Sequence, residues 1–325
     1  MNIHHLSYQP GRTAIADGKE CLFFSGYSYL GMNHVREFNE LVKEGFDKYG
    51  LLFPSSRISN TRLSLFEEVE ALLSSLTGSE ETVLASSGFT AGQMSVLVYN
   101  QKIHCLPYAH PAIQSGNTNQ GDKHIIATDS INVLNATVTD FSFLQQSPAD
   151  ICIVDDSHGF GLLGERGEGI AFSLPKLNVE YVLTYSLSKA CNIIGGAISC
   201  TKQTANKLRA LPSYAAGTAA SPAYLYAFIK GQSLYALQRE KLKKNIAFFQ
   251  SLIKNIEGVT YHPQLPVFIL PGTVDEEKLF ADNIIISSFA YPDPNGKKIQ
   301  RIVLNALHTE EDMERLINCL LRYNK

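Results

Sequence analysis

Two short apolar runs in this 325-residue chain end in side chains that can perform acid–base or nucleophilic chemistry. Residues 151–154 are followed directly by Asp155 and, within the same DDSHG segment, by His158. Residues 181–185 are followed shortly by Lys189, which stands 34 positions after Asp155. Short apolar runs of this kind are typical of buried parallel strands. Because open α/β sheets bind ligands at the carboxyl ends of their strands, we expect the acid and the lysine at one site.

A third segment has the composition of a phosphate-binding turn. Ser86-Ser87-Gly88-Phe89-Thr90 lies between the strand-like residues 82–85 and a helix, whose N-terminal amides favour an anion. A lysine, an acid and a phosphate cradle together suit pyridoxal 5'-phosphate (PLP). In such sites the lysine holds the cofactor as a Schiff base, and a carboxylate keeps the pyridine nitrogen protonated so that the ring is an electron sink. The pattern therefore predicts a PLP site.

The glycines that follow Asp155 also spell the dinucleotide-binding pattern G-x-G-x-x-G at residues 159–164. That fingerprint needs its glycines at a strand-to-helix turn and an acid about 20 positions further on. Here polar residues separate the strand from the glycines, Gly167 and Gly169 interrupt any helix, and position 184 is a threonine. We therefore set a nicotinamide site aside.

The remaining pattern predicts an α/β protein with a small terminal domain. Helices are expected from about residue 35 to Gly50 and from Ser64, where Ser64 and Glu67 have the spacing of a capping box, to Gly78. The strand-like runs are residues 82–85, 103–106, 124–128, 151–154, 181–185 and 197–200. A long helical stretch at 222–256 precedes a terminal α/β region whose last helix starts at Thr309.

Composition limits the possible partners. Lys and Arg total 28 against 31 Asp and Glu, a net charge of −3, so nucleic acid is not expected as a partner. The six cysteines contain no C-x-x-C pair, which argues against a disulfide framework or a zinc ribbon and favours reduced thiols. No metal is predicted, and no apolar stretch approaches 18 residues, so the expected location is the cytoplasm, without a membrane span.

Over nearly its whole length the sequence resembles the fold-type I PLP enzymes of the α-oxoamine synthase family, within the class I/II aminotransferase superfamily. The segments that carry this resemblance are Tyr29-Leu30-Gly31, Ser56-Arg57 with Thr61, Ser87-Gly88-Phe89, Asp155 to Gly159 followed by Leu163 to Gly167, and Ser186-Leu187-Ser188-Lys189. The resemblance implies a mostly parallel central sheet flanked by helices. It also implies an N-terminal segment (residues 1–45) packing with the small domain, a large PLP-binding domain (46–220), and a connecting helix with a small C-terminal α/β domain (221–325).

The resemblance also implies a catalytic role for four residues. Lys189 would be the Schiff-base lysine, and Asp155 would be the partner of the pyridine nitrogen. His158 would contact the ring hydroxyl, and His110 would stack on the pyridine ring. Each of three has an ordinary alternative: Lys189 as a solvated surface group, Asp155 as a turn cap, and His110 as a packing histidine.

Further residues are implied in binding the phosphate and the substrate. The amides of Gly88 and Phe89, with the Ser186 hydroxyl, would hold the phosphate, and Thr218 would reach it from the neighbouring subunit of a homodimer. Arg301 would bind the substrate carboxylate, although it is otherwise an ordinary exposed strand charge. The sequence departs from the family pattern in two places: Val133 stands where a serine is expected, and Tyr27 lies in the segment where the family has an asparagine near the substrate carboxylate.

These expectations lead to a PLP-dependent transferase that condenses a small amino acid with an acyl-CoA. Lys189 would serve first as the Schiff-base partner and then as the proton-transfer base. An aminotransferase or an aldolase-type reaction is possible on the same scaffold, because fold alone does not separate these activities. A catalytically degenerate interaction protein is a third hypothesis, and the intact pair of Asp155 and Lys189 argues against it.

Overall fold

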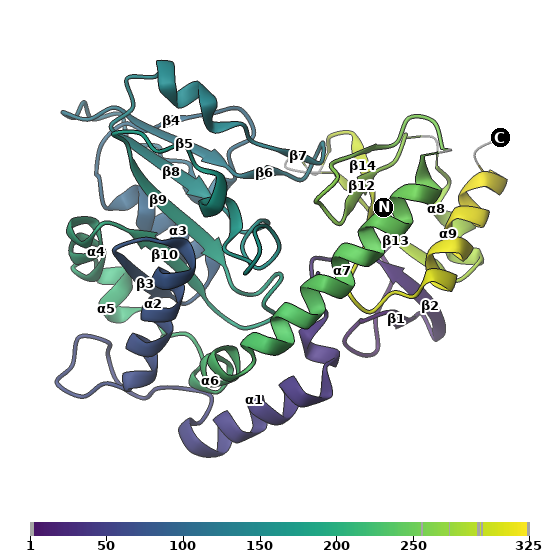
Figure 1. The fold of residues 1–325 in the computed structure, drawn as a ribbon, viewed down its shortest axis with the longest axis horizontal. Helices are drawn as coiled ribbons and strands as arrows, with labels where there is room; N and C mark the ends of the chain where they lie inside the picture. Colours follow the sequence, from purple (N-terminus) through teal and green to yellow (C-terminus); the bar gives the residue numbers. More distant parts are fainter. Residues whose placement is uncertain (1–2, 255, 273, 291–292, 294, 324–325) are drawn as a thin grey trace. The chain divides into compact units, whose positions relative to one another are not determined.

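The computed structural model describes residues 3–254, 256–272, 274–290, 293 and 295–323 (Figure 1). The chain forms two compact units. Unit 1 comprises residues 1–34, 133–137 and 237–325, and unit 2 comprises residues 35–132 and 138–236. Each unit contains its own six-stranded sheet. None of the helices among the described residues is both long and apolar enough to cross a membrane.

The sheet of unit 2 contains all six strands that the apolar runs predict. In spatial order they are β3 (Glu81–Ala85), β10 (Gly196–Cys200), β9 (Glu180–Ser186), β8 (Ile151–Asp155), β5 (Ile125–Asp129) and β4 (His104–Cys105). Every residue of β8 and β10 is buried, which explains why these strands read as continuous apolar runs rather than as alternating patterns. The core cluster of this unit contains residues from each of the six strands, partly buried Cys105 representing β4.

The sheet is mostly parallel, as the resemblance implies, and one strand is the exception. Strands β4, β5, β8 and β9 are parallel, but β10 is antiparallel to both β9 and β3. Only residues 187–195 separate β9 from β10, and a parallel crossover needs a dozen or more residues. The short connection therefore turns the chain back, and Lys189 lies within it.

The helices of unit 2 are α1 (Arg36–Tyr49), α2 (Ser64–Thr77), α3 (Gly88–Leu97), α4 (Lys202–Arg209), α5 (Pro212–Ala216) and α6 (Pro222–Lys230). Both predicted N-terminal helices are confirmed, and Gly50 and Gly78 follow them with φ values of +72° and +69°. The predicted capping box at Ser64 is wrong. Leu63 is the extended N-cap residue, so Ser64 is already helical, and its hydroxyl donates to Glu68 instead.

Unit 2 also contains the short helical turns η2 (Pro111–Ile113), η3 (Phe141–Gln146) and η4 (Gly169–Ser173). Strands β6 (Ile131–Asn132) and β7 (Thr137–Val138) form a separate two-stranded sheet directly after β5. Residues 156–168 form turns rather than a helix, so the glycines of the dinucleotide-like pattern do not begin a helix.

The sheet of unit 1 joins the two ends of the chain. Its strands, in spatial order, are β1 (Thr13–Ala16), β2 (Lys19–Phe24), β13 (Ile284–Ala290), β14 (Lys298–Val303), β12 (Val267–Ile269) and β11 (Thr260–Tyr261). The N-terminal strand β2 pairs in parallel with the C-terminal strand β13. The other elements of the unit are η1 (Met32–His34), α8 (Glu276–Ala281), α9 (Glu310–Tyr323) and the part of α7 (Gln232–Ile253) from residue 237 onward.

An ion pair strengthens this link between the chain ends. Arg12 donates two hydrogen bonds, of 2.6 and 2.8 Å, to the carboxylate of Asp312 at the start of α9. Burial alone would raise the pKa of Asp312, but the hydrogen bonds from Arg12 and the Thr309 amide lower it below its ordinary value. The N-terminal strand and the last helix are thus joined by a charged contact as well as by the sheet.

Candidate active site

The carboxyl ends of three neighbouring parallel strands bring together the polar residues of unit 2. Asp155 is the last residue of β8, and it is paired in register with Asp129 of β5 on one side and Thr184 of β9 on the other. Asp155 is buried, and its Oδ1 atom accepts a 2.9 Å hydrogen bond from the Ser157 amide. The structure therefore places the acid of the DDSHG segment at the edge where the sequence predicted it.

Lys189 lies in the tight connection that follows β9. Two backbone hydrogen bonds close this connection: the Leu187 amide donates to the Gly195 carbonyl at 3.0 Å, and the Ile193 amide donates to the Leu187 carbonyl at 3.1 Å. Asn192, at φ +54°, donates from its side chain to the Lys189 carbonyl at 3.0 Å. Asn192 was not identified from the sequence, although asparagine is a residue that tolerates a positive φ.

The surroundings of Lys189 favour its neutral amine. Burial lowers the pKa of Lys189, and the negative charges of Asp155, Asp129 and Asp156 oppose this shift without overcoming it. A lysine with a lowered pKa is more often neutral at physiological pH, and only the neutral amine can act as a nucleophile or a base. The site thus combines a reactive amine with a buried acid.

His110 faces the same acid. Its Nδ1 atom lies 3.9 Å from Asp155 Oδ2 and accepts a 3.1 Å hydrogen bond from the Ala112 amide, so its proton is on Nε2. Burial lowers the pKa of His110, the charge of Asp155 opposes that shift, and the charge of Lys189 adds to it. His110 is therefore a neutral imidazole with a fixed orientation, half-buried beside Asp155.

Asp129 is a member of this cluster that sequence reasoning did not identify. Its Oδ1 atom accepts a 2.8 Å hydrogen bond from the His110 amide. Burial raises the pKa of Asp129, and the neighbouring charge of Asp155 raises it further. The only sequence signal was its place at the end of a strand-like run, because its partner His110 lies 19 residues earlier in the chain.

The predicted phosphate cradle is the N-terminus of helix α3. Ser87 is the N-cap, and its hydroxyl accepts a 3.1 Å hydrogen bond from the Thr90 amide. Gly88 and Phe89, as the first residues of the helix, present amides that have no partner inside it. A Cβ atom at Gly88 would lie 2.5 Å from the Cβ of Ser186, so only glycine allows the cradle to lie this close to the end of β9.

Asp156 packs under the site and explains several of the glycines. It is fully buried, and its carboxylate accepts hydrogen bonds from the Ser130 hydroxyl at 2.5 Å and the Ile170 amide at 2.8 Å. A Cβ atom at Gly159 or Gly169 would overlap the Asp156 carboxylate. Gly159, the first glycine of the dinucleotide-like pattern, and Gly169 therefore make room for a buried acid, and Asp156 has a structural role here.

The other sequence-predicted residues lie at different depths. Ser186 is buried and bonded to Ser188, with their hydroxyl oxygens 2.8 Å apart, and His158 is half-buried. The Phe89 side chain is 57% exposed, and Thr218 is exposed in the segment after α5. Unit 2 therefore brings Lys189, Asp155, His110 and the cradle to one edge of its sheet.

The two predicted substrate-binding residues belong to unit 1. Tyr27 is exposed, whereas Arg301 is half-buried on β14, with its guanidinium 4.9 Å from the centre of the Phe289 ring. Arg301 donates a 3.3 Å hydrogen bond to the Val133 carbonyl, and burial lowers its pKa. Among the described residues its buried Nε atom has no hydrogen-bond partner and its guanidinium has no acid partner. Such an arginine can accept an external carboxylate.

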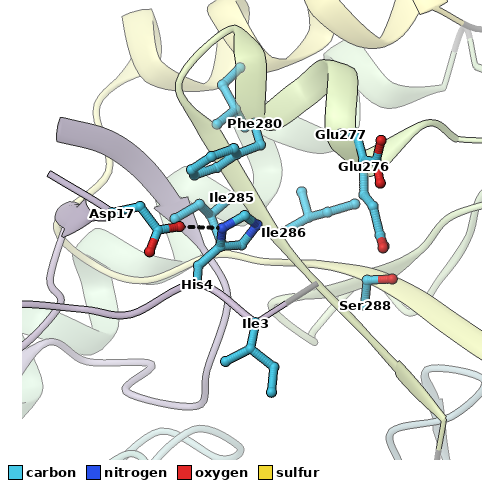
Figure 2. A pocket seen from close by; sticks show the side chains of 10 residues that line it. Ile3, His4, Asp17, Glu276, Glu277, Phe280, Ile285, Ile286 and Ser288 are labelled. Carbon is cyan, nitrogen blue, oxygen red and sulfur yellow. Dashed lines mark hydrogen bonds and ion pairs between the residues drawn. The ribbon is translucent and has the colours of Figure 1, made fainter. Parts of the chain in front are cut away.

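Unit 1 also contains a hollow of about 490 Å³ that none of the predicted residues lines. Figure 2 shows His4 there, bonded to Asp17 at 2.9 Å and stacked on Phe280 with ring centres 3.8 Å apart. The acidic side chains of Glu276 and Glu277 also line it. This hollow is distinct from the residues that carry the predicted chemistry.

The residues present in unit 2 fit PLP. The cofactor needs an amine, an acid for the pyridine nitrogen and donors for the phosphate. Lys189 with a lowered pKa, the buried Asp155, and the cradle of Gly88, Phe89 and Ser186 supply groups of these three kinds. In addition, the buried hydroxyl of Thr184 has no partner in the described part of the chain, so the site retains unused hydrogen-bonding capacity.

Comparison with known proteins assigns the class. The sequence profile described as aminotransferase class I and II matches residues 137–320, more than half of the chain, and the chain belongs to that family. Its fold is that of the fold-type I PLP-dependent transferases, as predicted. The predicted resemblance to α-oxoamine synthases is likewise confirmed.

Individual relatives and solved structures show which enzymes this chain is similar to. The 8-amino-7-oxononanoate synthase of Fervidobacterium nodosum is 25% identical, and that of Coprothermobacter proteolyticus is 28% identical; each match covers 97% of this chain and 91% of the relative. Among solved structures, serine palmitoyltransferase from S. paucimobilis, with bound PLP and myriocin, superposes with a TM-score of 0.85 at 16% identity, covering 99% of this chain and 92% of that one. The 8-amino-7-oxononanoate synthase from Francisella tularensis gives 0.75 at 23% identity, covering 94% and 98%.

The packing of Asp156 leads to a stability prediction. We expect Asp156→Ala to lower the free energy of unfolding of the cofactor-free protein by roughly 2–4 kcal/mol, because two buried donors lose their acceptor. Asp150→Ala is the matched control, since the exposed Asp150 also accepts a backbone hydrogen bond, from the His124 amide at 2.8 Å. Denaturant unfolding at a fixed protein concentration measures both. Equal, small losses in the two variants would contradict the assigned role of Asp156.

Proposed function

We propose that this protein is a PLP-dependent transferase of the α-oxoamine synthase type, which condenses a small amino acid with an acyl thioester such as acyl-CoA. One observation carries the proposal: β8 and β9 bring the buried Asp155 and the desolvated Lys189 to the same edge of the sheet, beside the cradle at the start of α3. The names of the curated relatives, all 8-amino-7-oxononanoate synthases among those compared above, support condensation rather than transamination.

The residues of unit 2 would divide the binding of the cofactor among them. Lys189 would hold PLP covalently, and Asp155 would pair with the pyridine nitrogen. His110, a neutral ring, would lie against the face of the pyridine, and His158 would contact the ring hydroxyl. Bound in this way, PLP supplies an electron sink for the electron pair left at the substrate α-carbon.

Lys189 would also move the proton. Its Nζ atom, whose pKa burial lowers, would take the proton from the α-carbon of the amino acid, so that the electron pair left there can bond to the acyl carbonyl carbon while the thiolate of the acyl donor leaves. Once the carboxylate has departed as CO2, the same nitrogen would return the proton to the α-carbon. Because Asp129 accepts a hydrogen bond from the His110 amide, it would keep the neighbouring imidazole in place during this proton transfer.

The amino-acid carboxylate would bind to Arg301. The support is a half-buried guanidinium stacked on Phe289, without an acid partner among the described residues. Tyr27 is a second candidate for contact with the substrate. Val133, which stands where the family pattern has a serine, would leave the cofactor with one contact fewer.

We also propose a homodimer in which the exposed Thr218 reaches the partner's phosphate site. Ser56 donates a 2.7 Å hydrogen bond to the Ala215 carbonyl, which holds residues 51–58 against the loop that carries Thr218. In that segment Leu51, Leu52 and Ile58 are exposed, as is typical of a surface that pairs with another chain. Sedimentation tests this: a monomer with full cofactor occupancy would remove the role of Thr218.

The proposed location is the cytoplasm. All six cysteines are free, which suits a reducing compartment. Cell fractionation with an antibody against the protein tests this, and recovery outside the cytosolic fraction would contradict it.

The condensation is tested by release of free CoA thiol. With a small amino acid and an acyl-CoA, we expect thiol release that depends on both substrates, and we expect Asp155→Asn to reduce turnover at least about a hundredfold with PLP retained, because the amide keeps the shape but not the charge. Formation of pyridoxamine phosphate without thiol release would favour transamination instead. Unchanged turnover in Asp155→Asn would reduce Asp155 to a turn cap.

The role of Arg301 is tested by Arg301→Lys. A single ammonium cannot offer two parallel donors to a carboxylate, so the KM for the amino acid should rise by about tenfold or more while the Kd for PLP stays within about twofold. The KM for acyl-CoA serves as the internal control. If the amino-acid KM were unchanged, the carboxylate would have to bind elsewhere.

A further inference from the structure

The outer edge of strand β3, next to the phosphate cradle, is held by a buried ion pair that the proposed mechanism does not use. Arg57 and Glu70 are only 7% and 8% exposed, and Arg57 Nη2 donates to Glu70 Oε1 at 2.8 Å. Arg57 Nη1 donates to the Leu84 carbonyl at 2.8 Å, and the Leu84 amide donates to Glu70 Oε1 at 2.9 Å. The pair therefore binds both backbone groups of a single residue.

The position of β3 explains why these backbone groups need partners. β3 is the last strand of its sheet, and among the described residues β10 is its one neighbouring strand. In an antiparallel pair alternate residues direct their amide and carbonyl away from the neighbouring strand. Leu84 is such a residue, so without Arg57 and Glu70 its two groups would be unpaired at the sheet edge.

The geometry of Arg57 is tightly fixed. Its guanidinium lies 4.9 Å from the centre of the Phe66 ring and 4.5 Å from that of Tyr214. Two aromatic contacts and two hydrogen bonds set both the position and the plane of the group. A lysine at this position would keep the charge but could not reproduce the forked contact with Leu84 and Glu70.

Leu84 stands only two residues before Ser86, where the cradle begins. On the inner side of the same loop, a Cβ atom at Gly196 would overlap the Ser87 carbonyl, which shows that β10 packs closely against the loop. The ion pair fixes the strand from the outer side. The position of the Gly88 amide relative to Ser186 is thus set from both directions.

We propose that Arg57 and Glu70 are positioning residues for the phosphate cradle, acting through the backbone of Leu84. The proposal rests on the proposed function in one respect, the assignment of the cradle to the cofactor phosphate. An ion pair that only stabilised the fold would affect all ligands of the site alike. A pair that positions the cradle would affect the binding of ligands that carry the phosphate group and leave the binding of phosphate-free ligands nearly unchanged.

The test compares two ligands that differ only in the phosphate. PLP and pyridoxal are titrated into the cofactor-free protein, and the ratio of their Kd values is measured for the wild type and for Arg57→Lys. We expect Arg57→Lys to raise the Kd for PLP by about tenfold and the Kd for pyridoxal by less than about twofold. Equal weakening of both ligands, or no change in either, would overturn the proposal.

Arg209→Lys is the matched control. Arg209 belongs to the same charged cluster, where it pairs with Glu81 and Glu70 and donates to the Thr82 carbonyl at 3.3 Å. The same substitution there leaves both hydrogen bonds of Leu84 intact. The ratio of the two Kd values should therefore stay within about twofold of the wild type. A loss of phosphate selectivity equal to that of Arg57→Lys would assign the effect to the cluster as a whole and overturn the specific role of Arg57.

Amide hydrogen exchange provides a readout that needs no cofactor. In the cofactor-free protein, the amides of residues 86–90 should exchange about tenfold faster in Arg57→Lys than in the wild type or in Arg209→Lys. If the wild type bound neither PLP nor pyridoxal, the proposed function would fail, while the exchange rates would still decide whether the ion pair holds the loop. Unchanged exchange would contradict the proposal. Should Arg57→Lys not fold, Glu70→Gln is measured in the same way, with the same direction expected.

Discussion

The rest of the site depends on keeping a carboxylic acid and an amine together at one largely desolvated edge of a sheet. Asp155 ends β8 and Lys189 follows β9, and parallel pairing of these strands brings their carboxyl ends together. Removing charges from water is costly unless they are paired or neutralised. The lowered pKa of Lys189 and the raised pKa of Asp129 are both consequences of that burial, and the same burial makes the amine reactive.

Backbone groups do much of the positioning around this pair. His110 is fixed through its own amide, by Asp129, and through its ring, by the Ala112 amide. Lys189 is fixed by the turn in which Asn192 binds its carbonyl. Because each contact uses a backbone atom, these contacts occupy only one ring nitrogen of His110 and leave the Lys189 amine to a ligand. The same principle extends to the cradle, where the ion pair of Arg57 and Glu70 holds the backbone of Leu84.

Local sequence patterns predicted the parts of the fold that depend on local physics. Continuous apolar runs predicted the buried strands, and Gly50 and Gly78 predicted two helix ends. The direction of β10 followed from the length of its connection rather than from its own composition. The capping box at Ser64 failed because a spacing of residue types does not fix which residue is the extended N-cap.

Residues whose roles depend on distant partners could not be found in this way. Asp129 acquires its role from His110, and Arg57 from Leu84, each across a gap in sequence that carries no periodic signal. Lys189 and Asp155 could be predicted from the sequence because each comes at or just after the end of a recognisable strand and because their spacing resembles that of a known family. The need of the buried Asp156 carboxylate for glycine at positions 159 and 169 is likewise visible only in three dimensions.

The central claim is that Lys189 is the residue that holds the cofactor, and covalent labelling tests it most directly. The purified protein, loaded with PLP, is reduced with borohydride, digested and mapped by mass spectrometry. The account predicts a single labelled peptide, the one that contains Lys189, and no label in Lys189→Arg. Label on another lysine, or no label in a protein loaded with PLP, would contradict it.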